Sequence, residues 1–228
     1  MVLKRVLLTG ASGTLGTELV ALNPDMLCPS SKEMDIINKR SVKAFFKDNE
    51  LDLVIHAAAF TNVPLSETRP DLAMMSNVIG THNLLEECMD RDIKFVFIST
   101  DYVFSGNHGP YSVDDPIDPL TNYAKSKAAA ELMVRMYDNS LVVRTSFFPR
   151  SFPYDKATTD QWTSKDYVDL IAPKIMSECL SDALGVIHCG TKKRAVFDIA
   201  KLRSPDVKPV KRKDLSHKIP KDTSFAWK

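Results

Sequence analysis

Three residues of this 228-residue chain have the types and the spacing that carbonyl reduction needs, namely Thr100, Tyr123 and Lys127. Thr100 follows an apolar run at 95–98, which predicts a buried strand that ends in hydroxyls. Tyr123 and Lys127 stand four positions apart, so on a helix both project from the same face. A hydroxyl, a phenol and an ammonium group can together protonate a carbonyl oxygen while hydride arrives at its carbon. The pattern therefore indicates nicotinamide-dependent ketone reduction.

A glycine-rich turn follows the first apolar run, at 6–8, and opens a predicted helix at 15–22. Its spacing is G-x-x-G-x-x-G rather than G-x-G-x-x-G, but the strand–turn–helix context that such a motif needs is met. Glycine allows backbone N–H groups to approach a pyrophosphate at the helix N-terminus, although an ordinary tight turn is the alternative. The residues expected to hold the cofactor here are Gly10, Ser12, Gly13, Thr14, Leu15 and Gly16.

The segment after the second predicted strand, at 26–28, bears on which cofactor is used. A site that prefers NAD usually has an acid here, whereas this chain has Ser30, Ser31 and Lys32. Hydroxyls and a lysine suit a ribose 2′-phosphate, so we expect Ser30 and Lys32 to favour NADP(H), with NAD(H) left open. Asp35 and Ile36 are expected near the adenine, although Asp35 could equally cap the next helix.

Strands alternate with helices along residues 1–146. Strands are predicted at 6–8, 26–28, 51–56, 95–98 and 141–144, and helices at 15–22, 42–47, 72–91 and 123–137. This order predicts an α/β fold with a Rossmann-like, doubly wound parallel sheet. Residues 147–165 are predicted to form a long loop, followed by a helix at 168–180, a strand at 186–188 and a helix at 196–202. We therefore expect a dinucleotide-binding domain at 1–146 and a reduced C-terminal substrate lobe at 147–228.

Composition excludes several classes of partner. Lys and Arg total 30 against 29 Asp and Glu, a formal net charge of +1, so neither nucleic acid nor a membrane surface is expected as a partner. No apolar run reaches the roughly 18–20 residues of a membrane span, and a cytoplasmic location is expected. The four cysteines form no C-x-x-C pair and show no metal-ligand spacing, so we expect reduced thiols and no metal.

Taken together, the motifs resemble the extended short-chain dehydrogenase/reductase superfamily, in its nucleotide-sugar branch of the dTDP-4-dehydrorhamnose reductase type. The resemblance is carried by the three glycines and by residues 56–63, 77–81, 99–106, 109–111, 114–131 and 143–146. Beyond Ser146 it thins to residues 198–201 and 220–224. It implies that Tyr123 is the general acid, that Lys127 is its partner and binds the nicotinamide ribose, and that Thr100 orients the substrate carbonyl.

The same resemblance implies further contacts. Asn77 would help to relay protons, or would simply be a packing amide. The three alanines at 57–59 would lie against the cofactor or only pack tightly; they are Ala57, Ala58 and Ala59. Asp101 and Tyr102 would touch the sugar. Phe147 stands where the family usually has tryptophan, so stacking on a sugar survives while the exact substrate is in doubt.

The chain after Ser146 is shorter than in a typical family member, so the substrate lobe is expected to be pared down. Trp162 would close over the ligand or be an exposed structural residue. Basic residues of the tail from Pro205 are predicted to be mostly solvated, with some contacting a sugar-nucleotide diphosphate; they are Lys208, Lys211, Arg212, Lys213, Lys218 and Lys221.

The resulting expectation is NADPH-dependent reduction of a 4-keto-6-deoxy nucleotide sugar to its alcohol. An epimerase on the same scaffold and a non-catalytic NADP-binding regulatory subunit remain alternatives. Dehydration is disfavoured, because Thr100-Asp101 lacks the Asp-Glu pair that a dehydratase needs. A homodimer through the two long helices is the oligomeric state that the resemblance implies.

Overall fold

A computed structural model describes residues 5–215 and 219–227. Its centre is a parallel sheet of five strands in the order β1-β2-β3-β4-β9. The strands are β1 (Val6–Thr9), β2 (Leu53–His56), β3 (Lys94–Thr100), β4 (Ser140–Thr145) and β9 (Gly185–Cys189). The first four are buried along almost their whole length, as parallel strands covered on both faces must be. The predicted Rossmann-like, doubly wound parallel sheet is confirmed.

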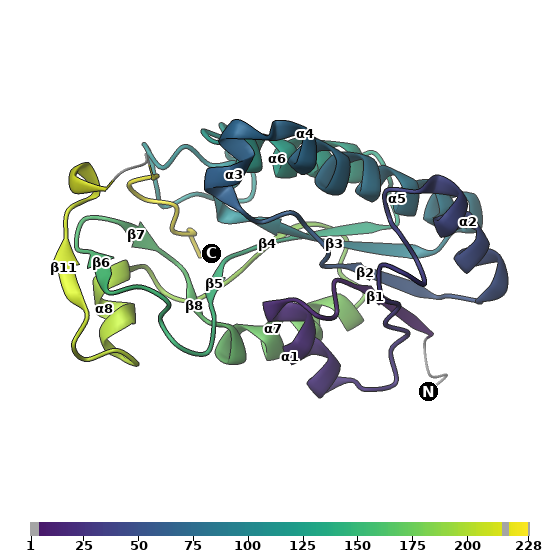
Figure 1. Ribbon diagram of the computed structural model, residues 1–228, viewed down its shortest axis with the longest axis horizontal. Coiled ribbons are helices and arrows are strands. Elements are labelled where there is room, and N and C mark those ends of the chain that lie inside the picture. The colour runs from purple at the N-terminus through teal and green to yellow at the C-terminus, as the bar shows by residue number, and fades with distance from the viewer. Residues whose placement is uncertain (1–4, 216–218, 228) are drawn as a thin grey trace.

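Helices cover both faces of this sheet (Figure 1). One face carries α1 (Thr14–Leu22) and α7 (Val168–Leu180), which pack on the sheet through residues such as Leu19 and Ile171. The opposite face carries α2 (Lys39–Asp48), α5 (Gly80–Arg91) and α6 (Asn122–Val134), packed through residues such as Phe46 and Leu84. Two apolar cores therefore hold the helices against the two faces of the sheet. Because its strands are parallel, their carboxyl ends lie at one edge. No helix within the described residues is long and apolar enough to cross a membrane.

Two predicted elements on the sheet side differ in the structure. The strand expected at 26–28 is reduced to one bridge, between Leu7 and Leu27. Pro24 and Pro29 flank it, and proline has no N–H with which to extend the ladder. The single helix expected at 72–91 is built from α4 (Pro70–Ala73), a π-helical turn (Met74–Ile79) and α5, and it follows the short α3 (Val63–Thr68).

The predicted loop at 147–165 is interrupted by three short strands. The lobe holds three two-stranded ladders, β5 (Phe147–Phe148) with β8 (Asp166–Tyr167), β6 (Lys156–Thr158) with β11 (Lys208–Val210), and β7 (Trp162–Thr163) with β10 (Arg194–Ala195). With α8 (Val196–Lys201) they enclose a small core around Phe148, Tyr167 and Ile199. In Figure 1 this lobe lies beyond the carboxyl end of β4, while α7 and β9 return to the sheet. The division into two domains at 146/147 stays a prediction.

The described basic residues of the tail are exposed or half-buried, as predicted for a mostly solvated segment, but the residues that follow them are buried. Residues 222–225 are all less than 9% exposed. Thr223 N–H donates to the Trp162 carbonyl, and Tyr111 N–H donates to the Ser224 carbonyl. The tail thus runs between the segment around Tyr111 and β7. Lys218 lies outside the described residues.

Candidate active site

A cavity of about 940 Å³ lies at the carboxyl edge of the sheet and is lined by residues that follow β1, β2, β3 and β4. Most of the predicted site residues line it together, namely Gly10, Ser12, Gly13, Thr14, Leu15, Gly16, Ser30, Asp35, Ile36, Ala57, Ala58, Ala59, Thr100, Tyr102, Tyr123, Lys127 and Phe147. Lys32, Asn77 and Asp101 are not among the lining residues. The topology therefore joins the glycine turn and the three reactive side chains in one cavity.

The glycine turn is packed so closely that side chains would not fit. Gly10 has φ +76°, and a Cβ there would lie 2.5 Å from the backbone nitrogen of Ala58. A Cβ on Gly16 would lie 2.1 Å from the Gly10 carbonyl oxygen. At Gly13 the nearest atom would be 3.2 Å away. Two of the glycines are thus required by the turn itself, and the third opens the turn toward the cavity.

The start of α1 offers free backbone donors to this cavity. Its N-cap, Gly13, has no side chain to cap the helix, and the first turn holds no acidic residue. The first N–H groups of a helix lack partners within the helix, and the helix dipole favours negative charge there. The hydroxyl of Thr145 is buried, lines the same cavity and has no hydrogen-bond partner within the described residues. These features fit a dinucleotide whose pyrophosphate lies at the glycine turn.

The cavity is also lined by a carboxylate that was not predicted from the sequence. Glu33 lines the cavity and folds back on Ser30, accepting hydrogen bonds of 2.8 Å from both its backbone N–H and its hydroxyl. The backbone hydrogen bond is the main reason why the pKa of Glu33 lies below its ordinary value. Lys32 is exposed and lies outside the cavity lining. The place expected for an acid was counted from the end of the predicted strand at 26–28. Because only one bridge of that strand forms, this count did not point to Glu33.

Asp35 does not cap the next helix, which was the alternative to contact with the adenine. The N-cap of α2 is Asn38, whose side chain accepts from the N–H groups of Arg40 and Ser41. Asp35 accepts the Ile37 N–H at 3.1 Å and lines the cavity. Its role at the adenine stays a prediction.

Tyr123 is held in the first turn of α6, opposite the end of β3. Thr121 caps this helix through the Ala124 N–H, and the Tyr123 N–H donates to the Ser66 hydroxyl at 3.1 Å. Burial raises the pKa of the Tyr123 phenol to about 12, although a hydrogen bond with Thr100 works against the rise. The phenol is therefore fully protonated at neutral pH and adjoins the Thr100 hydroxyl.

Lys127 lies one helical turn further on and is buried. Its ammonium donates to the Ile98 carbonyl at 2.7 Å and lies 3.9 Å from the centroid of the Phe97 ring. Burial lowers the pKa of Lys127 to about 7, and the charge on Glu131 opposes part of that change. The structure thus places Lys127 beside the strand end, while its partnership with Tyr123 stays a prediction.

A buried ion pair fixes α6 against the sheet beneath these residues. Glu131 accepts two hydrogen bonds from the Arg144 guanidinium, at 3.0 and 2.6 Å, and one from the Ser99 hydroxyl at 2.6 Å. Both members of the pair are at most 1% exposed. Glu131 follows Lys127 by four positions on the same helix. The Glu131–Arg144 pair therefore also fixes the position of Lys127 and Tyr123 relative to the strand ends.

Asn77 and Asp101 do not line the cavity, but each hydrogen-bonds neighbouring segments. Asn77 lies in the π-helical turn, where its amide bonds both backbone groups of Phe60 and the Ser126 hydroxyl at 2.9 Å. Asp101 is 1% exposed and accepts hydrogen bonds from the hydroxyls of Thr223 at 2.6 Å and Thr163 at 3.4 Å. The relay role of Asn77 and the sugar contact of Asp101 stay predictions.

Lys165 lines the cavity and was not expected from the sequence. Its ammonium lies 4.7 Å from the centroid of the Tyr102 ring. Trp162 lies in β7, is 37% exposed and lies outside the cavity lining, with the Lys193 ammonium over its ring. No motif or spacing marks Lys165, which precedes β8 and is positioned by contacts with Thr191 and Arg194, far along the chain.

A doubly wound parallel sheet with a glycine turn after its edge strand β1, and with Thr100, Tyr123 and Lys127 at the carboxyl end of its central strand β3, defines the class of short-chain dehydrogenases/reductases. The chain belongs to the RmlD substrate binding domain family, whose model matches residues 4–152.

Among solved structures, a dTDP-4-dehydrorhamnose reductase from Bacillus anthracis matches with a TM-score of 0.89 and 29% identity, over 98% of this chain and 90% of that chain. A corresponding structure from Clostridium acetobutylicum matches with a TM-score of 0.88 and 26% identity, over 97% of this chain and 90% of that chain. The fold of nearly the whole chain, residues after 146 included, is thus shared with these structures.

Curated relatives match over a shorter span. The spore coat polysaccharide biosynthesis protein SpsK of Bacillus subtilis is 39% identical over 149 residues, which are 63% of this chain and 53% of that protein. The dTDP-4-dehydrorhamnose reductase of Aggregatibacter actinomycetemcomitans is 37% identical over 150 residues, 63% of this chain and 51% of that protein. The chain thus spans about half the length of these curated relatives.

Proposed function

We propose that this protein reduces a 4-keto-6-deoxy nucleotide sugar of the dTDP-4-dehydrorhamnose type to its alcohol, with a nicotinamide cofactor. The observation that carries the proposal is the meeting of Thr100, Tyr123 and Lys127 with the glycine turn in one cavity. Relatives named dTDP-4-dehydrorhamnose reductase support the substrate class.

The residues of the cavity divide the work of such a reaction. A bound reduced nicotinamide supplies the hydride. Tyr123, protonated at neutral pH because its pKa is about 12, donates the phenolic proton to the carbonyl oxygen. Thr100, hydrogen-bonded to that phenol, orients the same oxygen. Lys127 in its charged form stabilises the phenolate left behind.

We also propose a preference for NADP(H), which depends on the residues at the adenosine end of the cavity. Ser30 and Ser31 both line the cavity. The Ser31 hydroxyl could bond a 2′-phosphate, whereas the Ser30 hydroxyl donates to Glu33, whose carboxylate would repel the phosphate. The Bacillus anthracis reductase structure is a complex with NADP, which supports the phosphorylated cofactor. On the basis of that complex, we expect NADPH to have the lower Michaelis constant. Glu33→Gln should widen the difference about tenfold, and a clear preference for NADH would contradict this part of the proposal.

The decisive test incubates the protein with NADPH and a panel of 4-keto nucleotide sugars and follows the loss of reduced-nicotinamide absorbance. Turnover is expected with a dTDP-4-keto-6-deoxy sugar. Tyr123→Phe should lower kcat by about 100-fold or more, the usual scale of general acid catalysis, and leave cofactor binding unchanged. Full activity of that variant would overturn the mechanism.

The same panel separates the two alternatives. An epimerase would interconvert sugars without net consumption of NADPH. A regulatory subunit would bind NADPH tightly and turn over none of the sugars. The shared fold keeps this second alternative open, since fold alone does not fix function.

A further inference from the structure

Lys165 places an unpaired ammonium group at the substrate end of the cavity. It lines the cavity together with Thr100, Tyr102 and Tyr123. The ammonium lies over two aromatic rings, 4.7 Å from the Tyr102 centroid and 5.5 Å from that of Phe148. Within residues 5–215 and 219–227, no carboxylate lies at ion-pairing distance from it. Aromatic faces attract a cation but leave its hydrogen-bond donors free for a ligand.

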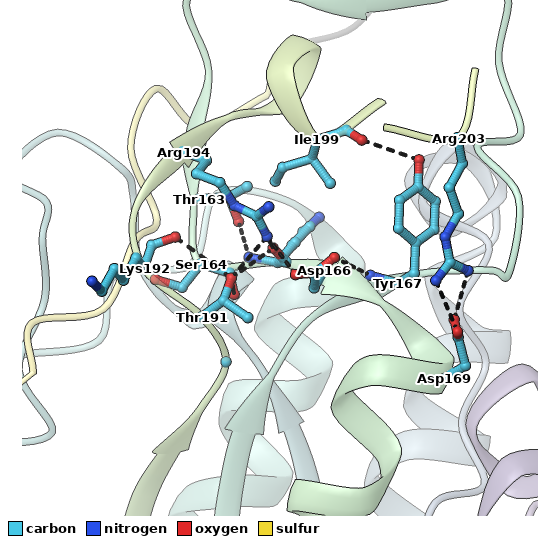
Figure 2. Close-up of polar contacts among 12 residues, drawn as sticks. Thr163, Ser164, Asp166, Tyr167, Asp169, Thr191, Lys192, Arg194, Ile199 and Arg203 are labelled. Atoms are coloured by element: carbon cyan, nitrogen blue, oxygen red, sulfur yellow. Dashed lines mark hydrogen bonds and ion pairs between the residues drawn. The ribbon is translucent and has the colours of Figure 1, made fainter. Parts of the chain in front are cut away.

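The backbone that carries this side chain is fixed on both sides. Lys165 N–H donates to the Thr163 hydroxyl at 3.2 Å, and its carbonyl accepts from the Thr191 hydroxyl at 3.1 Å and from the Arg194 guanidinium at 3.3 Å. Figure 2 shows the Arg194 guanidinium directed at Thr191 and at the carboxylate of Asp166, the next residue along. The segment is therefore anchored to the β9–β10 connection, so the cation is held in place before any ligand binds.

No other lining residue offers a lasting positive charge. Lys127 is the only other basic residue that lines the cavity within the described chain, and its ammonium is engaged with the Ile98 carbonyl. The pKa of Lys127, about 7, leaves it only partly charged near neutrality. For Lys165, burial lowers the pKa, but Tyr102 and Asp101 outweigh that effect and hold it above its ordinary value.

The described part of the basic tail does not reach the cavity. None of its described basic residues lines it. Lys208 lies in β11, paired with β6, and the Arg212 guanidinium donates to the carbonyls of Asp160 and Ile219. A sugar-nucleotide diphosphate in the cavity would therefore need a cation other than the described basic residues of the tail.

We propose that Lys165 binds a phosphoryl group of the nucleoside diphosphate sugar and so holds the sugar over Thr100 and Tyr123. The choice of ligand rests on the proposed function. The acidic residues that line the cavity, Glu33 and Asp35, border the adenosine end, so a phosphorylated substrate meets positive charge only at the end that carries Lys165. A charge-assisted hydrogen bond from an ammonium is the contact that phosphate oxygens accept most strongly.

The test measures the binding of thymidine diphosphate and of uridine diphosphate by calorimetry to the NADP-loaded protein. Lys165→Met should weaken the binding of at least one of them about 10- to 100-fold, and high salt should reduce the difference between this variant and the wild type. Lys165→Arg should stay within a few-fold of the wild type. The exposed Lys192→Met is the matched control and should bind as the wild type does. Affinity for NADP should be the same in all four proteins.

Equal nucleoside diphosphate affinity of Lys165→Met and the wild type would overturn the inference, as would a wild type that binds neither nucleotide. A lower kcat of Lys165→Met at unchanged nucleotide affinity would also overturn it and assign the lysine to Tyr123 instead. If the wild type binds the nucleotide through Lys165 but reduces no sugar of the panel, the proposed reaction fails while this inference stands.

Discussion

Replacing Glu131 by glutamine should destabilise the protein strongly, because it discharges one member of a buried ion pair. The carboxylate accepts three hydrogen bonds, two from Arg144 and one from Ser99, and both charged side chains are at most 1% exposed. Glutamine keeps the shape of the side chain but leaves the guanidinium buried with only neutral acceptors, among them the Val113 carbonyl at 3.1 Å. The loss is therefore one of charge compensation rather than of packing.

The size of the effect follows from this burial. Removing one partner of a buried pair typically lowers the free energy of unfolding by about 3–5 kcal/mol. Since glutamine retains one acceptor oxygen, we expect the lower end, about 3 kcal/mol. For a chain of this length each kcal/mol shifts the melting temperature by about 2–4 °C, so the Tm should fall by roughly 6–12 °C.

Urea unfolding, monitored by circular dichroism, measures the change at constant m value. The matched control is Glu50→Gln, which discharges an exposed pair with Arg5 whose carboxylate side chain is 93% exposed, and its effect should lie within experimental error. The double variant Glu131→Met, Arg144→Met should be more stable than Glu131→Gln, because no unpaired charge stays buried. A Glu131→Gln protein as stable as the control would refute the reasoning.

Three further outcomes are expected. Gly16→Ala should abolish NADP binding measured by calorimetry, whereas Gly13→Ala should fold and weaken it by less, since their Cβ atoms would meet the Gly10 oxygen at 2.1 and 3.2 Å. Burial lowers the pKa of His56 to about 3, so the unfolded chain takes up a proton from about pH 6.5 downward and the folded one does not. The contribution of His56 to stability should therefore be complete above its unfolded pKa and fall by about 2 kcal/mol between pH 7 and pH 5, so His56→Gln should reduce the slope by that amount in urea titrations. Thr223→Val removes a donor from the buried Asp101 and should lower stability by about 1–3 kcal/mol, with Thr223→Ser restoring it in the same assay.

Periodicity predicted most of the sheet and its helices because their signals are local. The helix at 168–180 has the predicted bounds, and β3 and β4 lie within about two residues of the predicted runs at each end. The glycine turn and the Tyr123–Lys127 pair likewise depend on short spacings, so the cavity they share follows once the strands are parallel.

Features that depend on contacts between distant segments of the chain could not be predicted from the sequence. The ladder of β6 with β11 joins segments some fifty residues apart, and two-residue strands such as β7 carry no alternating pattern to detect. Lys165 reaches the cavity through tertiary contacts that no motif encodes, whereas Glu33 is folded back by local bonds to Ser30. The proposed pairing of two chains through the long helices stays a prediction.

The hydroxyl of Thr223 bonds a carboxylate 122 positions earlier in the chain, and this separation sets an order of assembly. During synthesis, all five strands of the sheet can pair while Asp101 still lacks its main donor. The wall next to Thr100 closes only when residues 222–225 have left the ribosome and inserted beside Tyr111. A nascent chain therefore completes its glycine turn early and the wall beside Thr100 late, so cofactor binding should precede turnover.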